Sequence, residues 1–345
     1  MPWTRIIADQ GNGHDEIEKY QDRGERVLTY GEAITEAIDQ AMSLDPKVVI
    51  LGQGVATAGY VYETTAGLGQ RYGRERVIET PIAEAAMTGV TLGAALAGLR
   101  PVLIHMRNDF LMVSMDQIVN HIAHWQTLFQ GTHGVPLVIR AVIARGWGSG
   151  AQHSQSLQAL FAGFDGLDVL LPATPYDVKG LFLSAVASPR PVLFLEHRWL
   201  YEDKGYVPIN PYFVPIGEGV LRTQGEDCTV VAMSLTNRDV SQAVKDLRNE
   251  GISVEWIDLR SVHPLDISII KNSVIKTGRL IVVENGPLSY SVGSEILACI
   301  AETCWGVLKA PMKRIGWPGT TVPAGRMLEE KFYPGAEEIK QAVRK

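Results

Sequence analysis

Residues 80–110, TPIAEAAMTGVTLGAALAGLRPVLIHMRNDF, decide the fold. Thr80-Pro81 offers a helix N-cap with proline at the first helical position. The apolar, glycine-containing residues that follow predict a helix smooth enough for another helix to approach closely. The run Val102–Ile104 then predicts a buried strand. A helix that leads directly into a buried strand is the repeating unit of α/β proteins.

The same alternation extends along the chain in both directions. Thr29-Tyr30-Gly31-Glu32 has the form of a capping box and predicts an amphipathic helix, and Val48–Gly52 predicts a strand after it. Later strands are expected at 137–143, 169–171, 192–195, 229–233, 254–257 and 280–283, with helices at 110–129, 155–162, 240–249, 267–277 and 293–304. The predicted fold class is therefore α/β, with parallel strands covered by helices.

The length predicts two domains, because single cores stop growing at about 250–300 residues and this chain has 345. Prolines and glycines interrupt the pattern between Tyr201 and Asp227. We expect a polar N-terminal arm at 1–28, a larger domain at 29–205, a linker at 206–226 and a smaller α/β domain at 227–345.

Composition limits the function classes. The net charge is -6, which disfavours binding to nucleic acid or to anionic membranes. The 3 cysteines are too few for a disulfide framework and fit a reducing cytosol. The first 26 residues lack the apolar core of a signal peptide, and no apolar run reaches the roughly 20 residues that cross a bilayer. We expect a cytoplasmic protein with small-molecule or protein partners and no membrane segment.

Two places could carry chemistry. Glu84 lies among apolar residues, where desolvation allows a carboxyl to exchange a proton near neutrality, although a glutamate favoured by the helix dipole is the more ordinary explanation. His153 lies in the run RGWGSGAQHSQ, residues 145–155, after an expected strand, where α/β sheets place ligands. His153 could donate a proton there, or merely cap a helix in a flexible loop. The glycine spacing matches no nucleotide-binding fingerprint.

The order of several short motifs is typical of one family. T-P-I-x-E at 80–84, G-A-A-x-A-G-L-x-P-V at 93–102, D-F at 109–110, D-Q-I-x-N at 116–120 and G-x-Q-H-S-Q at 150–155 follow one another. Together they resemble the β subunit of thiamine-diphosphate-dependent 2-oxo acid dehydrogenases, the E1 component of the pyruvate and branched-chain complexes. The resemblance implies a transketolase-like fold, with a parallel-sheet pyrimidine-binding domain and a smaller α/β C-terminal domain.

The resemblance also implies roles for individual residues. Glu84 would be catalytic by hydrogen-bonding N1′ of the cofactor's aminopyrimidine, in a dry pocket. His153 would be catalytic near the thiazolium C2, handling the 2-oxo acid or the acyl transfer. Phe110 would stack on the pyrimidine, and Ile82 and Met106 would make apolar cofactor contacts.

The sequence departs from the family pattern at several positions. Among residues 101–110 an acidic residue of the family is lost at Ile104, and His105 and Arg107 are gained. Together with Gln152 these two are candidate substrate contacts, although the alternation of a strand equally allows Arg107 to face a subunit interface. The turn Gly52-Gln53-Gly54-Val55 lacks the carboxylates that connect the two active sites in relatives. The loop at 185–190 has lost polar ligands of a structural potassium ion, so that ion is not expected.

The Gly-Asp-Gly…Asn motif that holds Mg²⁺ and the diphosphate is absent from the sequence. We therefore expect thiamine diphosphate as cofactor, no metal ligand in this chain, and Mg²⁺ held by an α subunit in an α2β2 assembly. The implied activity is decarboxylation of a 2-oxo acid and transfer of the acyl-equivalent carbanion to lipoamide on a lipoyl acyltransferase. A split transketolase-like or acyloin-forming carboligase, or a noncatalytic scaffold subunit, are alternatives. The sequence identifies neither the 2-oxo acid nor the acceptor.

Overall fold

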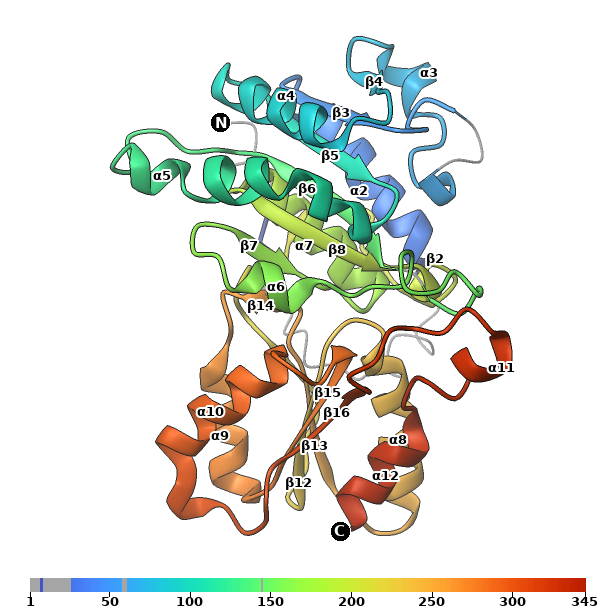
Figure 1. The fold of residues 1–345 in the computed structure, drawn as a ribbon, viewed down its shortest axis with the longest axis vertical. Coiled ribbons are helices and arrows are strands. Elements are labelled where there is room, and N and C mark those ends of the chain that lie inside the picture. Colours follow the sequence, from blue (N-terminus) through green and yellow to red (C-terminus); the bar gives the residue numbers. More distant parts are fainter. Residues whose placement is uncertain (1–6, 9–25, 58–60, 144) are drawn as a thin grey trace.

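A seven-stranded sheet forms the centre of the first domain (Figure 1). The computed structural model describes residues 7–8, 26–57, 61–143 and 145–345. Strand order is β14-β7-β8-β6-β5-β3-β4, and all neighbours are parallel except β14 with β7. The strands are β3 Val48–Gly52, β4 Val77–Glu79, β5 Arg100–His105, β6 Val138–Ile143, β7 Asp168–Leu170, β8 Val192–His197 and β14 Ser261–His263. The predicted parallel sheet is confirmed.

Helices cover both faces of this sheet. Helices α2 Tyr30–Leu44 and α7 Pro175–Ala187 pack together behind it in Figure 1, and α2 begins at the predicted capping box of Thr29 and Glu32. The front face carries α4 Glu84–Leu96 and a chain of short helices. These short helices are the 3-10 helix η3 Asn108–Ser114, the π-helix η4 Asp116–Ala123 and α5 Trp125–Leu128. The other short helices of this domain are η2 Val61–Glu63, α3 Leu68–Tyr72, α6 Gln158–Ala162 and η5 Arg198–Leu200.

Two predicted helices have different boundaries or geometry. The helix expected to start at Pro81 begins at Glu84 instead, because the Thr80 amide donates to the Gly52 carbonyl at 3.0 Å and ties that residue to the sheet. Ala83 precedes the helix with a φ of -155°, which is not helical. Glu84 is therefore the first residue of α4, whereas a helix that started at Pro81 would place it about one turn from the helix N-terminus. The single helix expected at 110–129 is a succession of 3-10, π and α turns, and π-helices are often found at functional sites.

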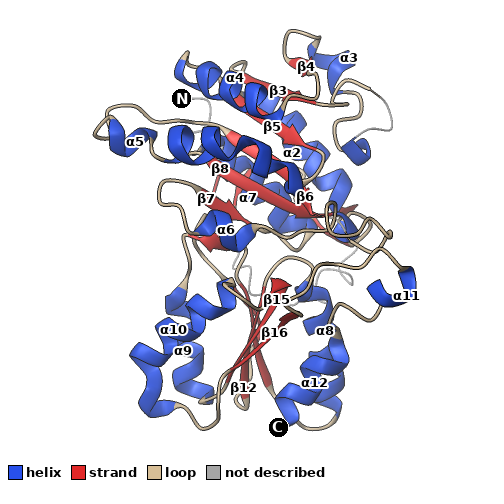
Figure 2. Cartoon of the chain, viewed as in Figure 1, coloured by secondary structure: helices blue, strands red, loops and turns tan. Residues whose placement is uncertain are grey.

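The second domain is a five-stranded sheet between two helical layers (Figure 2). Its strand order is β11-β13-β12-β15-β16, parallel except for β11. The strands are β11 Val220–Thr223, β12 Cys228–Ala232, β13 Val254–Asp258, β15 Leu280–Pro287 and β16 Lys313–Trp317. One side carries α8 Thr236–Asn249 and α12 Ala336–Arg344, and the other carries α9 Ile267–Thr277 and α10 Val292–Cys304.

The segment expected as a linker, 206–226, contains two strands. β10 Tyr212–Phe213 pairs with β1 Ile7–Ala8, and β11 forms the edge of the second sheet. Most of the expected N-terminal arm lies outside the described residues, although β2 Val27–Thr29 pairs with β9 Lys204–Tyr206. The remaining short elements are η6 Trp305–Val307 and α11 Arg326–Glu329. No helix among the described residues is long and apolar enough to cross a membrane.

A buried ionic cluster joins the two domains. Arg222 of the second sheet pairs with Asp177 of α7 and with Asp258, the latter at 2.8 Å, and Arg260 lies 3.3 Å from Asp177. Buried charges are tolerated when they are paired in this way. The charge pairs therefore fix the junction of the two domains.

Candidate active site

The carboxyl ends of β5 and β6 bring the main predicted residues together. These strands are parallel neighbours, so the segments that follow them meet at one edge of the sheet. The rings of Phe110, after β5, and His153, after β6, lie edge to face with centroids 5.3 Å apart. Both side chains are partly exposed, so they are open to a ligand at this edge.

Arg107 supports the segment that carries His153. Its Nη1 donates to the His153 carbonyl at 3.1 Å, and its guanidinium carbon lies 5.4 Å from the ring centroid of Trp147. Both contacts are within this chain. The guanidinium therefore holds the loop that follows β6.

Two neighbouring residues, which the sequence analysis did not select as site residues, hold the next part of that loop. Asn108 donates from Nδ2 to the Gln155 carbonyl at 2.9 Å and accepts from the Leu157 amide at 3.1 Å. Asp109 accepts from the Gln155 amide at 2.9 Å, and burial raises the pKa of Asp109. Asn108 and Asp109 thus fix the backbone immediately after His153.

The other candidate substrate residues lie in two different environments. His105, the last residue of β5, is only 6% exposed, and burial lowers its pKa to about 4. Its Nε2 atom has no hydrogen-bond partner among the residues that the structure describes. The imidazole is therefore neutral at physiological pH and cannot attract an anion as a cation. Gln152 is exposed in the loop.

Glu84 lies on the helix beside η3 and is not enclosed by this chain. Thr88, one turn later in α4, donates from its hydroxyl to that of Ser114 at 3.1 Å and connects α4 to the helix of Phe110. Glu84 is partly exposed in this chain, and Ile82 is 80% exposed. A further molecule must cover these groups if Glu84 is to be desolvated. Met106 is partly buried against the core of the first domain.

These residues fit one half of the cofactor expected from the sequence. An aromatic ring, an uncovered apolar side chain and a carboxyl suit an uncharged aminopyrimidine, which has a flat face and ring nitrogens. No group of three or more His, Cys, Asp or Glu among the described residues could hold a metal ion. The described chain thus offers groups that suit the pyrimidine side of such a site.

Carboxylates from distant elements hold two loops of this edge. Glu329 of α11 accepts from the amides of Gly146 and Gly148, at 2.6 and 2.8 Å. Glu79 of β4 accepts from the Gly54 amide and, at 3.1 Å, from that of Ala56. The sequence alone predicts neither contact, because no local pattern connects either glutamate to its loop.

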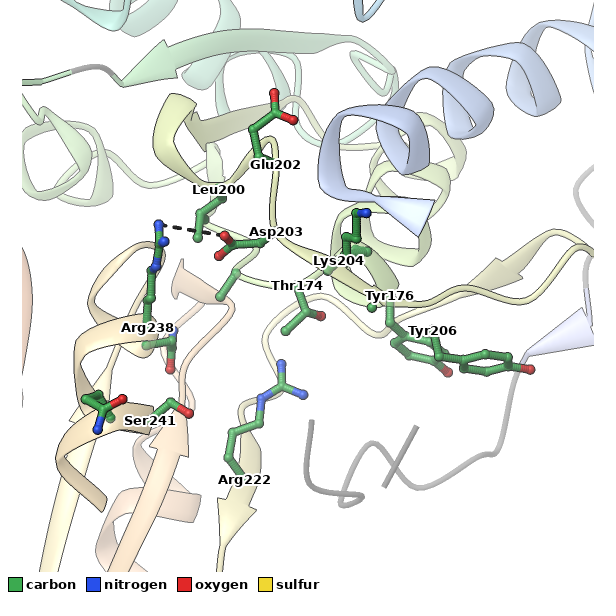
Figure 3. A pocket seen from close by; sticks show the side chains of 15 residues that line it. Thr174, Tyr176, Leu200, Glu202, Asp203, Lys204, Tyr206, Arg222, Arg238 and Ser241 are labelled. Atoms are coloured by element: carbon green, nitrogen blue, oxygen red, sulfur yellow. Dashed lines mark ion pairs between the residues drawn. The ribbon is translucent and has the colours of Figure 1, made fainter. Parts of the chain in front are cut away.

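A separate cavity of about 440 Å³ opens between the two domains (Figure 3). Its lining includes Lys204, Arg222 and Arg238 together with Glu202 and Asp203, and Arg238 lies 3.7 Å from Asp203. Cationic and anionic side chains thus both face the cavity. None of the site residues predicted from the sequence lines it.

Comparison with known proteins defines the family. Residues 26–204 match the transketolase pyrimidine-binding domain and residues 217–339 the transketolase C-terminal domain. The chain is 38% identical to the 2-oxoisovalerate dehydrogenase subunit beta of Bacillus subtilis and 40% identical to the pyruvate dehydrogenase E1 component subunit beta of Acholeplasma laidlawii. Each match covers 92% of this chain and 98% of the relative. The acetoin:2,6-dichlorophenolindophenol oxidoreductase subunit beta of Cupriavidus necator is 38% identical, over 93% of this chain and 97% of its own.

A solved split-gene transketolase, described as an inactive beta4 tetramer, has the same fold. Its TM-score is 0.74 at 24% identity, and the match covers 92% of this chain and 97% of that one. The chain therefore belongs to the transketolase-like family that contains the E1 β subunits of 2-oxo acid dehydrogenases, and the resemblance and the fold class inferred from the sequence are confirmed. Membership of this family implies dependence on thiamine diphosphate.

Proposed function

We propose that this chain is the β subunit of a thiamine-diphosphate-dependent 2-oxo acid dehydrogenase E1 component, which acts in the cytoplasm. The observation that carries the proposal is the half-site at the edge of the first sheet. Phe110 and His153 meet there, and Glu84 begins the helix packed beside them. Family membership supports the same activity.

In the proposed mechanism this chain binds the pyrimidine and moves protons. When bound, thiamine diphosphate would supply the nucleophilic carbon that the reaction with the 2-oxo acid requires. Glu84 would hold and exchange a proton at N1′ of the pyrimidine, and Phe110 would pack on its ring, with Ile82 and Met106 alongside. His153 would exchange a proton with the reacting carbonyl group.

The overall reaction balances with lipoamide as the acceptor. The 2-oxo acid loses CO₂, and the remaining acyl carbon is oxidised to a thioester. The lipoamide disulfide is reduced as one of its sulfurs takes the acyl group and the other takes a proton. A lipoyl acyltransferase would carry this acceptor.

The proposed partner is an α subunit that carries Gly-Asp-Gly…Asn and binds Mg²⁺ and the diphosphate, in an α2β2 assembly. The absence of a Gly-Asp-Gly…Asn motif from the sequence supports this division. The exposure of Ile82 and the partial exposure of Glu84 support a partner surface or cofactor that covers both.

Acyloin chemistry is a second candidate. The acetoin oxidoreductase subunit of Cupriavidus necator and the 2-oxoisovalerate dehydrogenase subunit of Bacillus subtilis are equally similar to this chain, at 38% identity. The complex should therefore be assayed with 2-oxo acids and with acetoin, with lipoamide as acceptor.

Hydrogen–deuterium exchange at C2 of the bound cofactor, measured by NMR in the α/β complex, tests the proposal. Glu84→Gln should slow this exchange by about 100-fold or more, because an amide cannot exchange a proton with N1′. Glu75→Gln, at an exposed position of the same domain, is the matched control and should leave the exchange unchanged. Near-wild-type exchange in Glu84→Gln would refute the assigned role.

A further inference from the structure

The loop that carries His153 packs against a distant part of the chain. We call residues 145–153 the glycine loop and residues 322–333 the C-terminal segment. Figure 1 shows α11 of the C-terminal segment beside the loop that leads from β6 towards α6. The two meet closely enough that a Cβ added at Gly148 would lie 2.9 Å from the Ala324 carbonyl oxygen. The glycine loop therefore has little freedom on this side.

One carboxylate makes the central contact. Glu329 is only 2% exposed, and its two oxygens accept from the amides of Gly146 and Gly148 at 2.6 and 2.8 Å. Both glycines have positive φ, +84° and +67°, a conformation that ordinary residues rarely adopt. Alternate amides that point at one anion form a small anion-binding concavity, and here a side chain of the same protein fills it.

Neighbouring contacts stabilise this arrangement. The Tyr333 hydroxyl donates to Glu329 Oε1 at 3.2 Å, and the guanidinium of Arg145 lies 4.1 Å from the Tyr333 ring centroid. Trp199 donates from Nε1 to the Arg145 carbonyl at 2.6 Å. The first residues of the glycine loop are thus held from two sides.

The far end of the same loop is held by Arg107, which donates to the His153 carbonyl. Glu329 at the start and Arg107 at the end are therefore two anchors of this nine-residue segment, in addition to the Trp199 bond to the Arg145 carbonyl. Loss of either contact should free part of the loop, and small displacements of a reacting group reduce rates strongly.

We propose that Glu329 is a positioning residue for His153, and that the C-terminal segment thereby forms part of the active-site structure. This inference rests on the proposed role of His153. Glu329 acts through the backbone of the glycine loop.

The test compares Glu329→Gln with Glu330→Gln in the α/β complex. Glutamine keeps the size of Glu329, but its NH₂ group faces an amide that needs an acceptor. Glu330 is an exposed carboxylate of the same segment, which pairs with Arg326 at 2.9 Å, and makes the matched control. Hydrogen exchange followed by mass spectrometry should show exchange at residues 145–157 faster by about tenfold in Glu329→Gln, and unchanged in Glu330→Gln.

Kinetic measurements distinguish a specific effect on His153 from a general loosening of the fold, because only the general effect would change kcat and cofactor C2 exchange together. In Glu329→Gln, kcat for decarboxylation should fall by about tenfold or more while cofactor C2 exchange stays within about twofold, because Glu84 is untouched. Tyr333→Phe, which removes only the hydroxyl bond to Glu329, is a milder variant and should change the same quantities by less.

Identical hydrogen exchange and identical kcat in Glu329→Gln and Glu330→Gln would overturn the inference. A parallel fall of C2 exchange and kcat in Glu329→Gln would also overturn it, because the effect would then be general. Absence of C2 exchange in the wild-type complex would instead refute the proposed function. This outcome is therefore distinct from those that would refute the positioning role of Glu329.

Discussion

The buried His105 makes the stability of this domain sensitive to acid, and His105→Ile should remove that sensitivity. The folded pKa is about 4, against an ordinary value of 6.5, because burial disfavours the imidazolium. Between these two values the unfolded chain takes up a proton that the folded chain does not. The stability associated with the neutral side chain is therefore complete above about pH 6.5 and is lost as the pH falls towards 4.

The size of the effect follows from the two pKa values. Their difference corresponds to about 3 kcal/mol when fully expressed, and to about 2 kcal/mol at pH 5. The free energy of unfolding of His105→Ile, relative to that of the wild type, should thus rise by about 2 kcal/mol between pH 7.5 and pH 5. Any change in packing adds a constant that cancels in this comparison.

Urea unfolding at both pH values, followed by circular dichroism and by tryptophan fluorescence, measures this difference. A free energy is extracted only where the two probes coincide, since a two-domain chain need not unfold in one step. Leu103→Ile, on the same buried strand and without a titratable group, is the control and should show a constant difference. A constant difference for His105→Ile as well would refute the argument, because it would mean that His105 is equally protonated in both states.

Three further outcomes are expected. In steady-state assays, Arg107→Met should lower kcat/KM by a similar factor for a plain 2-oxo acid and for 2-oxoglutarate, because the guanidinium binds the His153 carbonyl. A loss confined to 2-oxoglutarate, which carries a second carboxylate, would place Arg107 in the substrate pocket. Burial raises the pKa of Glu284 from 4.5 to about 7, so the stability associated with its protonated form is lost as the pH rises from 4.5 through 7. Glu284→Gln should therefore gain about 2.5 kcal/mol relative to the wild type between pH 5 and 8.5 in urea unfolding. The isolated chain should bind thiamine diphosphate weakly in calorimetry and the α/β complex tightly; tight, Mg²⁺-dependent binding by the isolated chain would contradict the half-site.

Local patterns were sufficient to predict most of the fold. The capping box before α2 and the helix at 267–277 depend on neighbouring residues, and the structure reproduces both. The start of α4 was wrong because a strand hydrogen bond from Thr80 to Gly52 prevails over the N-cap preference of Thr80-Pro81. The strand β14 was missed because it joins the first sheet from within the second domain, which no local pattern indicates.

The site shows the same limit more strongly. Motif order was enough to select Phe110 and His153, and the structure brings their rings together. Of the residues that hold the His153 loop, Arg107 was selected from the sequence for another role, whereas Asp109 and Glu329 were not selected, because Asp109 contacts the loop across 46 positions and Glu329 across 183. Such contacts are set by the sheet order and by the junction of the domains. A sequence pattern can identify a reacting group more readily than the groups that position it.

The exposure of Glu84 has a consequence for how the proposed enzyme would be controlled. Proton exchange between a carboxyl and a ring nitrogen is favoured where water is excluded from both groups. This chain leaves Glu84 partly exposed and Ile82 uncovered, while it already fixes the loop of His153 from both ends. This chain therefore positions the loop of His153 by its own contacts, but it does not by itself exclude water from Glu84. In the proposed α/β enzyme, cofactor binding and assembly with the α subunit would supply the missing desolvation, so that proton exchange at the pyrimidine begins only once the active site is closed.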